Sequence, residues 1–295
     1  MENLIPKLWQ ALISGLSAGS IYALIAQGYY ITYITTGALN FGQGEFLMIG
    51  ALFGFTCYVT LGLPYALAIL AVMLLVGLMG AVLERTAIRP VMTHALSLSW
   101  VLSTVAVSII LKNAALNLWG PEQIKFPSPF GEKVVHIGSA GIYPQELIVL
   151  VVALGAVVAV QIFLRRSILG KALMAVAFNR NAAAMMGINV RGMIILSFVL
   201  SSALAGLGGI LIAPITFAWA YMGTLPGIKA FAAAIFGGLE NPIGILVGGL
   251  AIGLLEQLFG IINSTLKDGI TFLFVLVILA FRPNGLMGRK EITKV

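Results

Sequence analysis

The sequence predicts an all-α, polytopic membrane protein with about eight or nine transmembrane helices. Hydrophobic residues occupy 60% of the 295 positions, and charged residues occupy only 9%. Soluble domains carry about 25% charged residues to keep their surface in water, so most of this chain's surface must face lipid. The mean hydropathy of +1.06 agrees with that conclusion.

Nine apolar stretches follow one another along the chain, and most approach the ~20 residues that a helix needs to cross a bilayer. The first, residues 8–34, contains no charge and is longer than a signal-peptide core, so we expect it to be a retained span. The other stretches lie at about 44–61, 63–83, 96–117, 145–164, 193–214, 222–239, 242–263 and 269–281. We therefore expect a single transmembrane domain over residues 1–295, with some short or broken helices.

Basic residues lie in short segments between the apolar stretches, and these segments orient the chain. They are Arg85 and Arg89; Arg165, Arg166, Lys171, Arg180 and Arg191; and Arg282, Arg289, Lys290 and Lys294. By the positive-inside rule these segments face the cytoplasm, as does the C-terminus. The charge-balanced segment at about 117–144 is the expected periplasmic loop, and nine spans would place the N-terminus outside. Because the positive charges lie in such loops, the net charge of +7 does not indicate a nucleic-acid partner.

Glycine and polar residues interrupt the apolar pattern at residues 35–45 and 237–244. Irregular backbone at membrane depth persists only where protein or a water-filled cavity satisfies its polar groups, and such breaks often mark a transporter's substrate path. An ordinary cytoplasmic turn is the alternative in each case. Gly15 and Gly19, and the glycines of residues 206–209, predict close helix packing.

The chain offers no enzyme chemistry. It lacks a phosphate-binding loop, because Gly170-Lys171 is followed by Ala172 and has no upstream glycine, so we predict that it does not hydrolyse ATP. Charged residues near or inside apolar stretches are functional candidates, since burying a charge in lipid costs several kcal/mol by most estimates. They are Glu45, Lys229, Glu240 and Glu256, and Glu45, Lys229 and Glu256 are the candidates for a substrate path. Simpler interpretations are a hydrogen bond from Glu256 to a neighbouring helix and a Lys229 that reaches the membrane interface.

The expected cytoplasmic loop at about 165–192 contains a short predicted helix over residues 181–187. Asn181 can cap its start, Ala182, Ala183 and Ala184 favour helix, and Gly187 can supply a left-handed C-terminal residue.

Met185 and Met186 would give this helix an adaptable apolar surface, which needs a partner. In a transporter without its own motor that partner is an ATPase. The alternative is that the helix packs back on the membrane domain.

Several ordered segments resemble one known family. They are Gly15-Leu16-Ser17, Tyr22-Ala23-Leu24-Ile25-Ala26, Asn40-Phe41-Gly42-Gln43-Gly44-Glu45-Phe46, Glu84-Arg85, Arg89-Pro90, Ala182-Ala183-Ala184, Gly187-Ile188-Asn189, Lys229-Ala230-Phe231 and the closing Arg282-Pro283. Together the segments are similar to the LivH-type inner-membrane permeases of bacterial branched-chain amino acid ATP-binding cassette (ABC) importers. The chain has Gly42 and Gln43 where that family commonly has Ala and His.

The resemblance implies the helical permease fold of ABC importers, with a translocation path between two permeases. The second permease would be a LivM-type paralogue, and a periplasmic binding protein would deliver the solute. Two cytoplasmic ATP-binding subunits would hold ATP and magnesium, so no cofactor is expected on this chain. The segment Ala182–Asn189, which includes Ile188, resembles the region that docks on the ATPase, and Asn40, Gln43 and Glu45 would line the path.

The expected function is therefore ATP-driven import of branched-chain or other hydrophobic amino acids across the bacterial inner membrane. Relatives that carry urea, amides or other small organic solutes provide a first alternative. An ion-coupled secondary transporter that uses Glu256 is a second alternative, and a membrane scaffold that transports nothing is a third.

Overall fold

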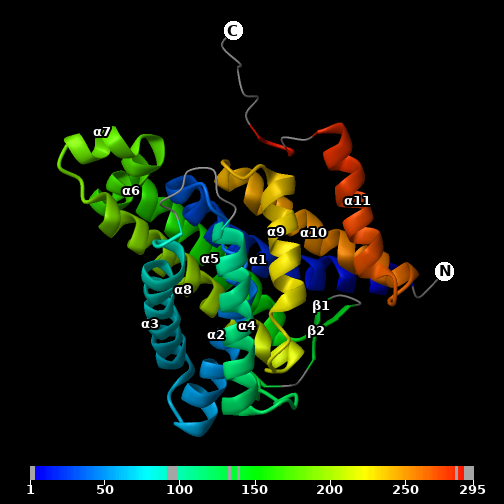
Figure 1. Ribbon diagram of the computed structural model, residues 1–295. Coiled ribbons are helices and arrows are strands. Elements are labelled where there is room, and N and C mark those ends of the chain that lie inside the picture. Colours follow the sequence, from blue (N-terminus) through cyan, green and yellow to red (C-terminus); the bar gives the residue numbers. More distant parts are fainter. Residues whose placement is uncertain (1–3, 92–98, 132–133, 138–139, 283–284, 289–295) are drawn as a thin grey trace.

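The structure of the chain is a computed structural model that describes residues 4–91, 99–131, 134–137, 140–282 and 285–288 (Figure 1). Its elements are α1 (Leu4–Thr36), α2 (Gln43–Phe55), η1 (Thr56–Thr60), α3 (Tyr65–Leu83), η2 (Glu84–Ile88), α4 (Ser99–Trp119), β1 (Val135–Ile137), β2 (Ala140–Ile142), α5 (Pro144–Arg166), α6 (Ile168–Phe178), α7 (Arg180–Met185), α8 (Val190–Thr216), α9 (Thr224–Gly237), α10 (Pro242–Ile262) and α11 (Lys267–Phe281). Every predicted apolar stretch coincides with a helix, so the predicted all-α class is confirmed. The antiparallel pair β1–β2 lies in the expected periplasmic loop.

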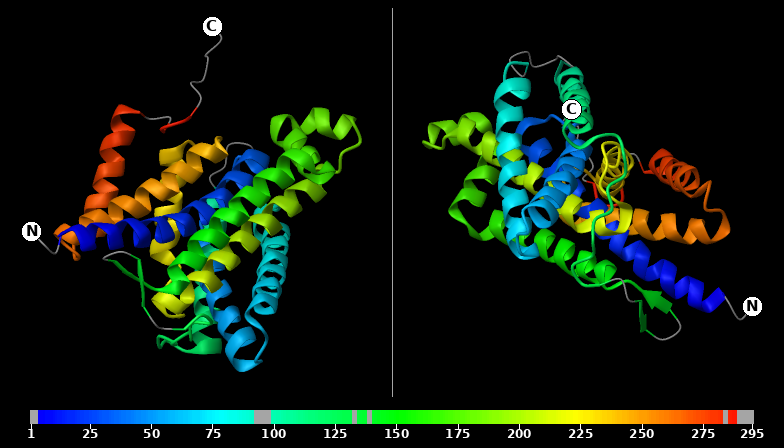
Figure 2. Two further views of the ribbon diagram at one scale, coloured as in Figure 1. Left: turned by 180° about the vertical axis from the view of Figure 1, so that it is seen from behind. Right: turned by 90° about the horizontal axis from the view of Figure 1, so that it is seen from below.

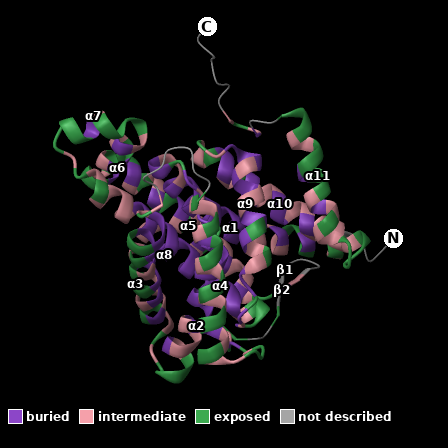
Figure 3. Ribbon diagram, in the orientation of Figure 1, coloured by how far each residue is buried: buried purple, intermediate pink, exposed green. Residues whose placement is uncertain are grey.

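Among the described residues, six helices are long and apolar enough to cross a membrane: α1, α3 with η2, α4, α5, α8 and α10. The other three predicted spans are shorter, with 13 residues in α2, 14 in α9 and 15 in α11. The π-helix η1 continues α2 without a break. Nearly all of α2 is buried, so it is an internal element of the bundle (Figure 3). The two interrupted stretches are the connections α1–α2 and α9–α10.

Helices α1 and α8 form the centre of the bundle. Helix α1 crosses the other helices obliquely and contacts α10, α8, α5 and α9, while α8 packs against α2 and α3 (Figures 1 and 2). Residues on both helices are largely buried (Figure 3). A displacement of α1 would therefore reach most of the molecule.

Glycines allow these central helices to approach each other closely, as the sequence predicts. Gly15 and Gly19 of α1 lie against the backbone of α10. Gly206 of α8 lies against Gly50 of α2, and a Cβ atom on Gly209 would collide with the carbonyl oxygen of Leu47. Small residues suit lipid-embedded interfaces, where packing replaces the hydrophobic drive.

A Gly209→Ala substitution is expected to destabilise the protein by about 1–3 kcal/mol, because the obstructing atom belongs to the backbone and cannot rotate away. Gly155→Ala in α5 is the matched control, since no heavy atom lies within 4 Å of its Cβ position. Alanine is also the better helix former by about 1 kcal/mol. Thermal unfolding in detergent measures both variants, and an unchanged midpoint for Gly209→Ala would contradict the packing argument.

The segments expected in the cytoplasm gather at one end of the bundle. Helices α6 and α7, the α9–α10 turn and residues 285–288 all lie there (top of Figure 1). Leu286 N–H donates to the carbonyl of Phe236 over 2.7 Å, which anchors the chain after α11 to the end of α9. At the other end, Ile124 of the expected periplasmic loop forms a β-bridge with Ala218. This grouping agrees with the positive-inside assignment; the side of the membrane that each end faces stays a prediction.

Candidate functional site: a charged pocket and an exposed helix pair

Asn40 and Gln43 hold the start of α2 in place. The Asn40 Oδ1 atom accepts the N–H of Gly42 over 3.0 Å. Gln43 Nε2 donates to the carbonyl of Ser201 over 2.9 Å, and the Ser201 hydroxyl donates back to Gln43 Oε1 over 3.1 Å. Both side chains are fully buried. The two residues thus join the α1–α2 break to α8. Neither of them lines the neighbouring pocket between α2, α4 and α9.

Glu45 lies in the first turn of α2 and lines a pocket between α2, α4 and α9. The cavity has a volume of about 220 Å³. It is lined by Tyr29, Phe41, Gly44, Glu45, Val105, Ser108, Lys112, Thr224, Gly227, Ile228 and Phe231. We call it the Glu45 pocket. Its wall is mostly aromatic and aliphatic, and its charged groups come from α2 and α4.

Lys112 of α4 supplies the cation of this pocket. Its Nζ atom lies 3.1 Å from Glu45 Oε1 and 3.2 Å from the Thr224 hydroxyl. The Ser108 hydroxyl donates to the same Glu45 oxygen over 2.9 Å. Lys112 is not among the site residues predicted from the sequence. A lysine inside an apolar stretch is as unusual as a glutamate there, and that signal could have identified it.

Three glycines bring α2 and α9 into backbone contact beside the pocket. A Cβ atom on Gly44 would collide with the carbonyl oxygen of Gly223, and one on Gly227 would lie 2.8 Å from the Gly44 Cα. The Tyr29 hydroxyl donates to the Gly227 carbonyl over 3.4 Å. The position of Glu45 relative to α9 is therefore fixed by contacts that leave no room for a side chain.

Lys229 and Glu256 form a separate ion network. Lys229 Nζ lies 2.9 Å from Glu256 Oε1 and 2.8 Å from Asp268 Oδ1. Tyr22 donates to Glu256 Oε2 over 2.8 Å, and Lys267 Nζ lies 3.4 Å from Glu256 Oε1. We call these five residues the Lys229 network; its two cations balance its two anions. It joins α1, α9, α10 and α11, and neither Lys229 nor Glu256 lines the Glu45 pocket.

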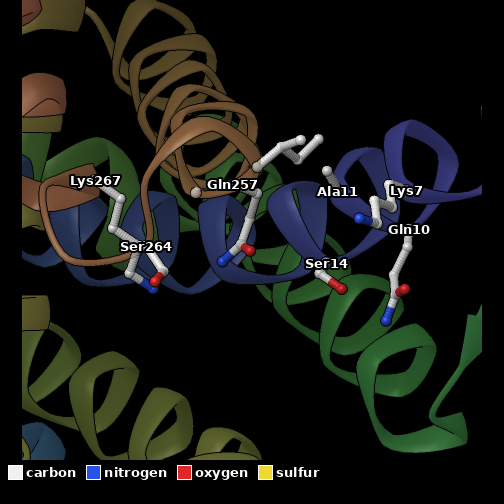
Figure 4. Close-up of a pocket in the computed structure, with 9 residues that line it drawn as sticks. Lys7, Gln10, Ala11, Ser14, Gln257, Ser264 and Lys267 are labelled. Atoms are coloured by element: carbon white, nitrogen blue, oxygen red, sulfur yellow. The ribbon is translucent and has the colours of Figure 1, made fainter. Parts of the chain in front are cut away.

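A second pocket of about 390 Å³ opens beside this network, between the first turns of α1 and the end of α10 (Figure 4). Its polar lining includes Lys7, Gln10, Ser14, Gln257, Ser264 and Lys267. Lys267 belongs to both the pocket and the Lys229 network. The lining of this second pocket shares no residue with the lining of the Glu45 pocket.

The short helix predicted over residues 181–187 is present as α7, with a different cap. The Ala182 N–H donates to Asn179 Oδ1 over 3.0 Å, so the prediction that Asn181 caps the helix is wrong. Asn181 lies inside α7, because the extended residue that a cap requires is Asn179. Gly187 has the predicted left-handed conformation, with φ of 81°.

Helix α6 precedes α7 and extends the exposed apolar surface (Figure 3). These residues were predicted to be part of the cytoplasmic loop, and a helix there was not predicted. Phe178 is 94% exposed, and Met185 and Met186 are 83% and 81% exposed. Ala183 is buried instead, and it fixes α7 on its inner side. We call residues 168–188 the α6–α7 segment; its outer face presents large apolar side chains without a covering element in the described chain.

Arg180 ties the α6–α7 segment to the centre of the bundle. Its Nε atom donates to the carbonyl of Thr35 over 2.9 Å, at the C-terminal end of α1. Partial burial lowers the pKa of the Arg180 guanidinium, which nevertheless stays charged as arginines do in proteins. Thr35 in turn donates to the Ser197 hydroxyl of α8 over 3.0 Å. A force on α7 can thus reach both central helices.

Long apolar helices around a small charged pocket, with an exposed apolar helix pair at one end, define the chain as a membrane transport permease. The family model described as "Branched-chain amino acid transport system / permease component" matches residues 11–280. The chain belongs to that family.

Relatives with described functions agree with this assignment. The chain is 33% identical to the high-affinity branched-chain amino acid transport system permease protein LivH of Escherichia coli (strain K12), over 97% of both chains. It is 32% identical to the permease protein BraD of Pseudomonas aeruginosa, also over 97% of both chains. Among solved structures, PsaBC from Streptococcus pneumoniae in complex with Fab is similar, with 17% identity, 97% and 94% coverage and a TM-score of 0.47.

Proposed function

We propose that the chain is the permease subunit of an ATP-driven importer of branched-chain amino acids in the bacterial inner membrane, with its C-terminus in the cytoplasm. A second permease of the LivM type, two ATP-binding subunits that hold ATP and magnesium, and a periplasmic binding protein complete the importer. The observation that carries the proposal is the Glu45 pocket. A small cavity with one charge pair and an apolar wall suits a small solute that is polar at one end and apolar at the other.

The α6–α7 segment supports the part of the proposal that concerns the ATP-binding subunits. A contiguous patch of exposed apolar side chains on a protein surface marks an interaction site. Met185 and Met186, which adapt to irregular surfaces, lie beside Ala184 on the exposed part of the segment, and Ala182 is half-buried. Through Arg180 and Thr35, closure of the ATPases would move α1 and α8.

In this proposal Asn40 and Gln43 shape the path without lining it, because they anchor the break from which α2 starts. The Lys229 network fixes the relative positions of α1, α9, α10 and α11. Glu256 already has Lys229, Lys267 and Tyr22 as partners, which favours a structural role over the exchangeable acid of an ion-coupled carrier.

The proposal is tested by purifying the tagged chain from native membranes in mild detergent and identifying the proteins that accompany it. We expect two ATPase subunits and a second permease. After reconstitution into vesicles with the binding protein, leucine uptake should require ATP and should not respond to proton or sodium gradients. Recovery of the chain alone, with gradient-driven uptake, would contradict the proposal and favour a secondary carrier.

A further inference from the structure

The polar groups of the Glu45 pocket converge from three helices. Glu45 of α2 supplies an anion, Lys112 of α4 supplies a cation, and Ser108 and Thr224 supply hydroxyls. The carboxylate accepts from the lysine and from Ser108, while the lysine also reaches Thr224. A hydroxyl can accept as well as donate a hydrogen bond. Ser108 can therefore bind the same ligand group as Glu45, and Thr224 can bind the same ligand group as Lys112.

Apolar side chains line the rest of the Glu45 pocket. The ring centroids of Phe41 and Phe231 lie 5.6 Å apart, and those of Tyr29 and Phe231 lie 5.7 Å apart. The three rings therefore form a continuous aromatic surface. Val105 and Ile228 complete the wall from α4 and α9. A volume of about 220 Å³ is below the ~300–1,000 Å³ of drug-sized ligand pockets, which favours a small solute.

Charge balance restricts which solute can occupy the pocket. Side chains of Glu45 and Lys112 are 5% and 24% exposed, so separating the pair without new partners would leave charges uncompensated. A zwitterion can replace both partners at once, because its ammonium group pairs with Glu45 and its carboxylate with Lys112. A solute with one charge leaves one residue unpaired, and a neutral amide such as urea replaces neither ionic contact.

We propose that the Glu45 pocket recognises the zwitterionic head of an aliphatic α-amino acid. Glu45 binds the ammonium group with help from Ser108, Lys112 binds the carboxylate with help from Thr224, and the apolar wall receives the side chain. This assignment rests on the proposed function and adds Lys112 as a recognition residue. It also disfavours urea and simple amides. Because the solute competes with the internal pair, its affinity is low and its release is fast.

The first test uses the complete reconstituted transporter with the double substitution Glu45→Gln and Lys112→Met. Removing both charges leaves no buried ion unpaired, so the complex is expected to assemble. The leucine-loaded binding protein should still stimulate ATP hydrolysis to within about twofold of wild type, while leucine uptake falls about tenfold or more. The matched control is Lys7→Met, an exposed lysine of α1, which should leave uptake unchanged.

Uptake by the double variant at the wild-type rate would show that the ion pair is structural only, and would overturn the recognition role. Absence of ATP-driven leucine uptake by the wild-type complex would instead overturn the proposed function. The two failures are therefore distinguishable.

A second test keeps the ion pair intact and does not depend on assembly of the double variant. Val105→Cys places a thiol in the pocket wall, and the chain's native Cys57 is buried. Leucine should slow alkylation of this thiol in the complete complex, whereas 4-methylpentanoate and 3-methylbutylamine, which each lack one charge, should not. Equal protection by all three molecules, or none by leucine, would overturn the proposal.

Discussion

Replacing Lys229 by methionine is expected to destabilise the protein by about 3–5 kcal/mol, because the buried Glu256 loses its nearer, buried cation. Glu256 would then keep only the more distant Lys267, at 3.4 Å, and the hydrogen bond from Tyr22, while Asp268 would lose its ion pair with Lys229. The side chains of Lys229 and Glu256 are 6% and 5% exposed, so water cannot compensate for the lost charge. A large drop in the thermal midpoint of the purified protein, or failure to recover it from membranes, is the expected result.

The double substitution Lys229→Met and Glu256→Gln is the control. It restores charge balance, because Lys267 and Asp268 remain, and glutamine still accepts the Tyr22 hydrogen bond. We expect it to recover most of the lost stability and to keep ATP-driven uptake. A double variant that is stable but does not transport would show that these residues belong to the translocation path, contrary to the structural role given to them here.

Replacing Gly187 by proline is expected to abolish ATP-driven uptake while the membrane helices persist. Gly187 has a φ of 81°, whereas the proline ring fixes φ near about −65°. Proline also lacks the N–H that Gly187 donates to the carbonyl of Ala184 over 3.0 Å. The end of α7 must therefore change direction, which displaces Met185 and Met186 from the docking face. Uptake in vesicles should fall about tenfold or more, with helical circular dichroism unchanged.

Gly187→Asn is the matched control, since asparagine tolerates the left-handed region and keeps its N–H. It should retain uptake and should still bring the ATP-binding subunits through purification. Normal uptake by Gly187→Pro would show that the shape of the α6–α7 segment does not matter for coupling, and the docking assignment would then be wrong.

Much of the fold could be predicted from the sequence because hydropathy is a local property. Each apolar stretch became a helix, and the stretch of glycine and polar residues at 35–45 contains the α1–α2 break. The sequence also predicted that Gly209 packs closely against another helix, because glycine on an apolar helix allows a neighbouring backbone to approach. Its partner, Leu47, was not predictable.

The pairings of the charged residues could not be predicted in the same way. Glu45 was a candidate from its position, but its partner Lys112 lies two helices further along the chain, in a stretch that hydropathy describes as an ordinary span. Glu256 and Lys229 were also identified separately, and only the structure shows that they are each other's partners. The cap of α7 differed by two residues, because Asn179 and Asn181 have the same capping chemistry and backbone conformation decides between them.

The sequence by itself determined that the chain crosses the membrane, where its apolar helices lie along the chain, and which family it belongs to. These properties depend on the hydropathy and the motifs of residues that are close together along the chain. The tertiary structure alone decided that Glu45 meets Lys112 in a small pocket, and that Lys229 meets Glu256 elsewhere. Which faces of two helices meet depends on backbone contacts such as Gly44 against Gly223, and these contacts join segments far apart in the sequence.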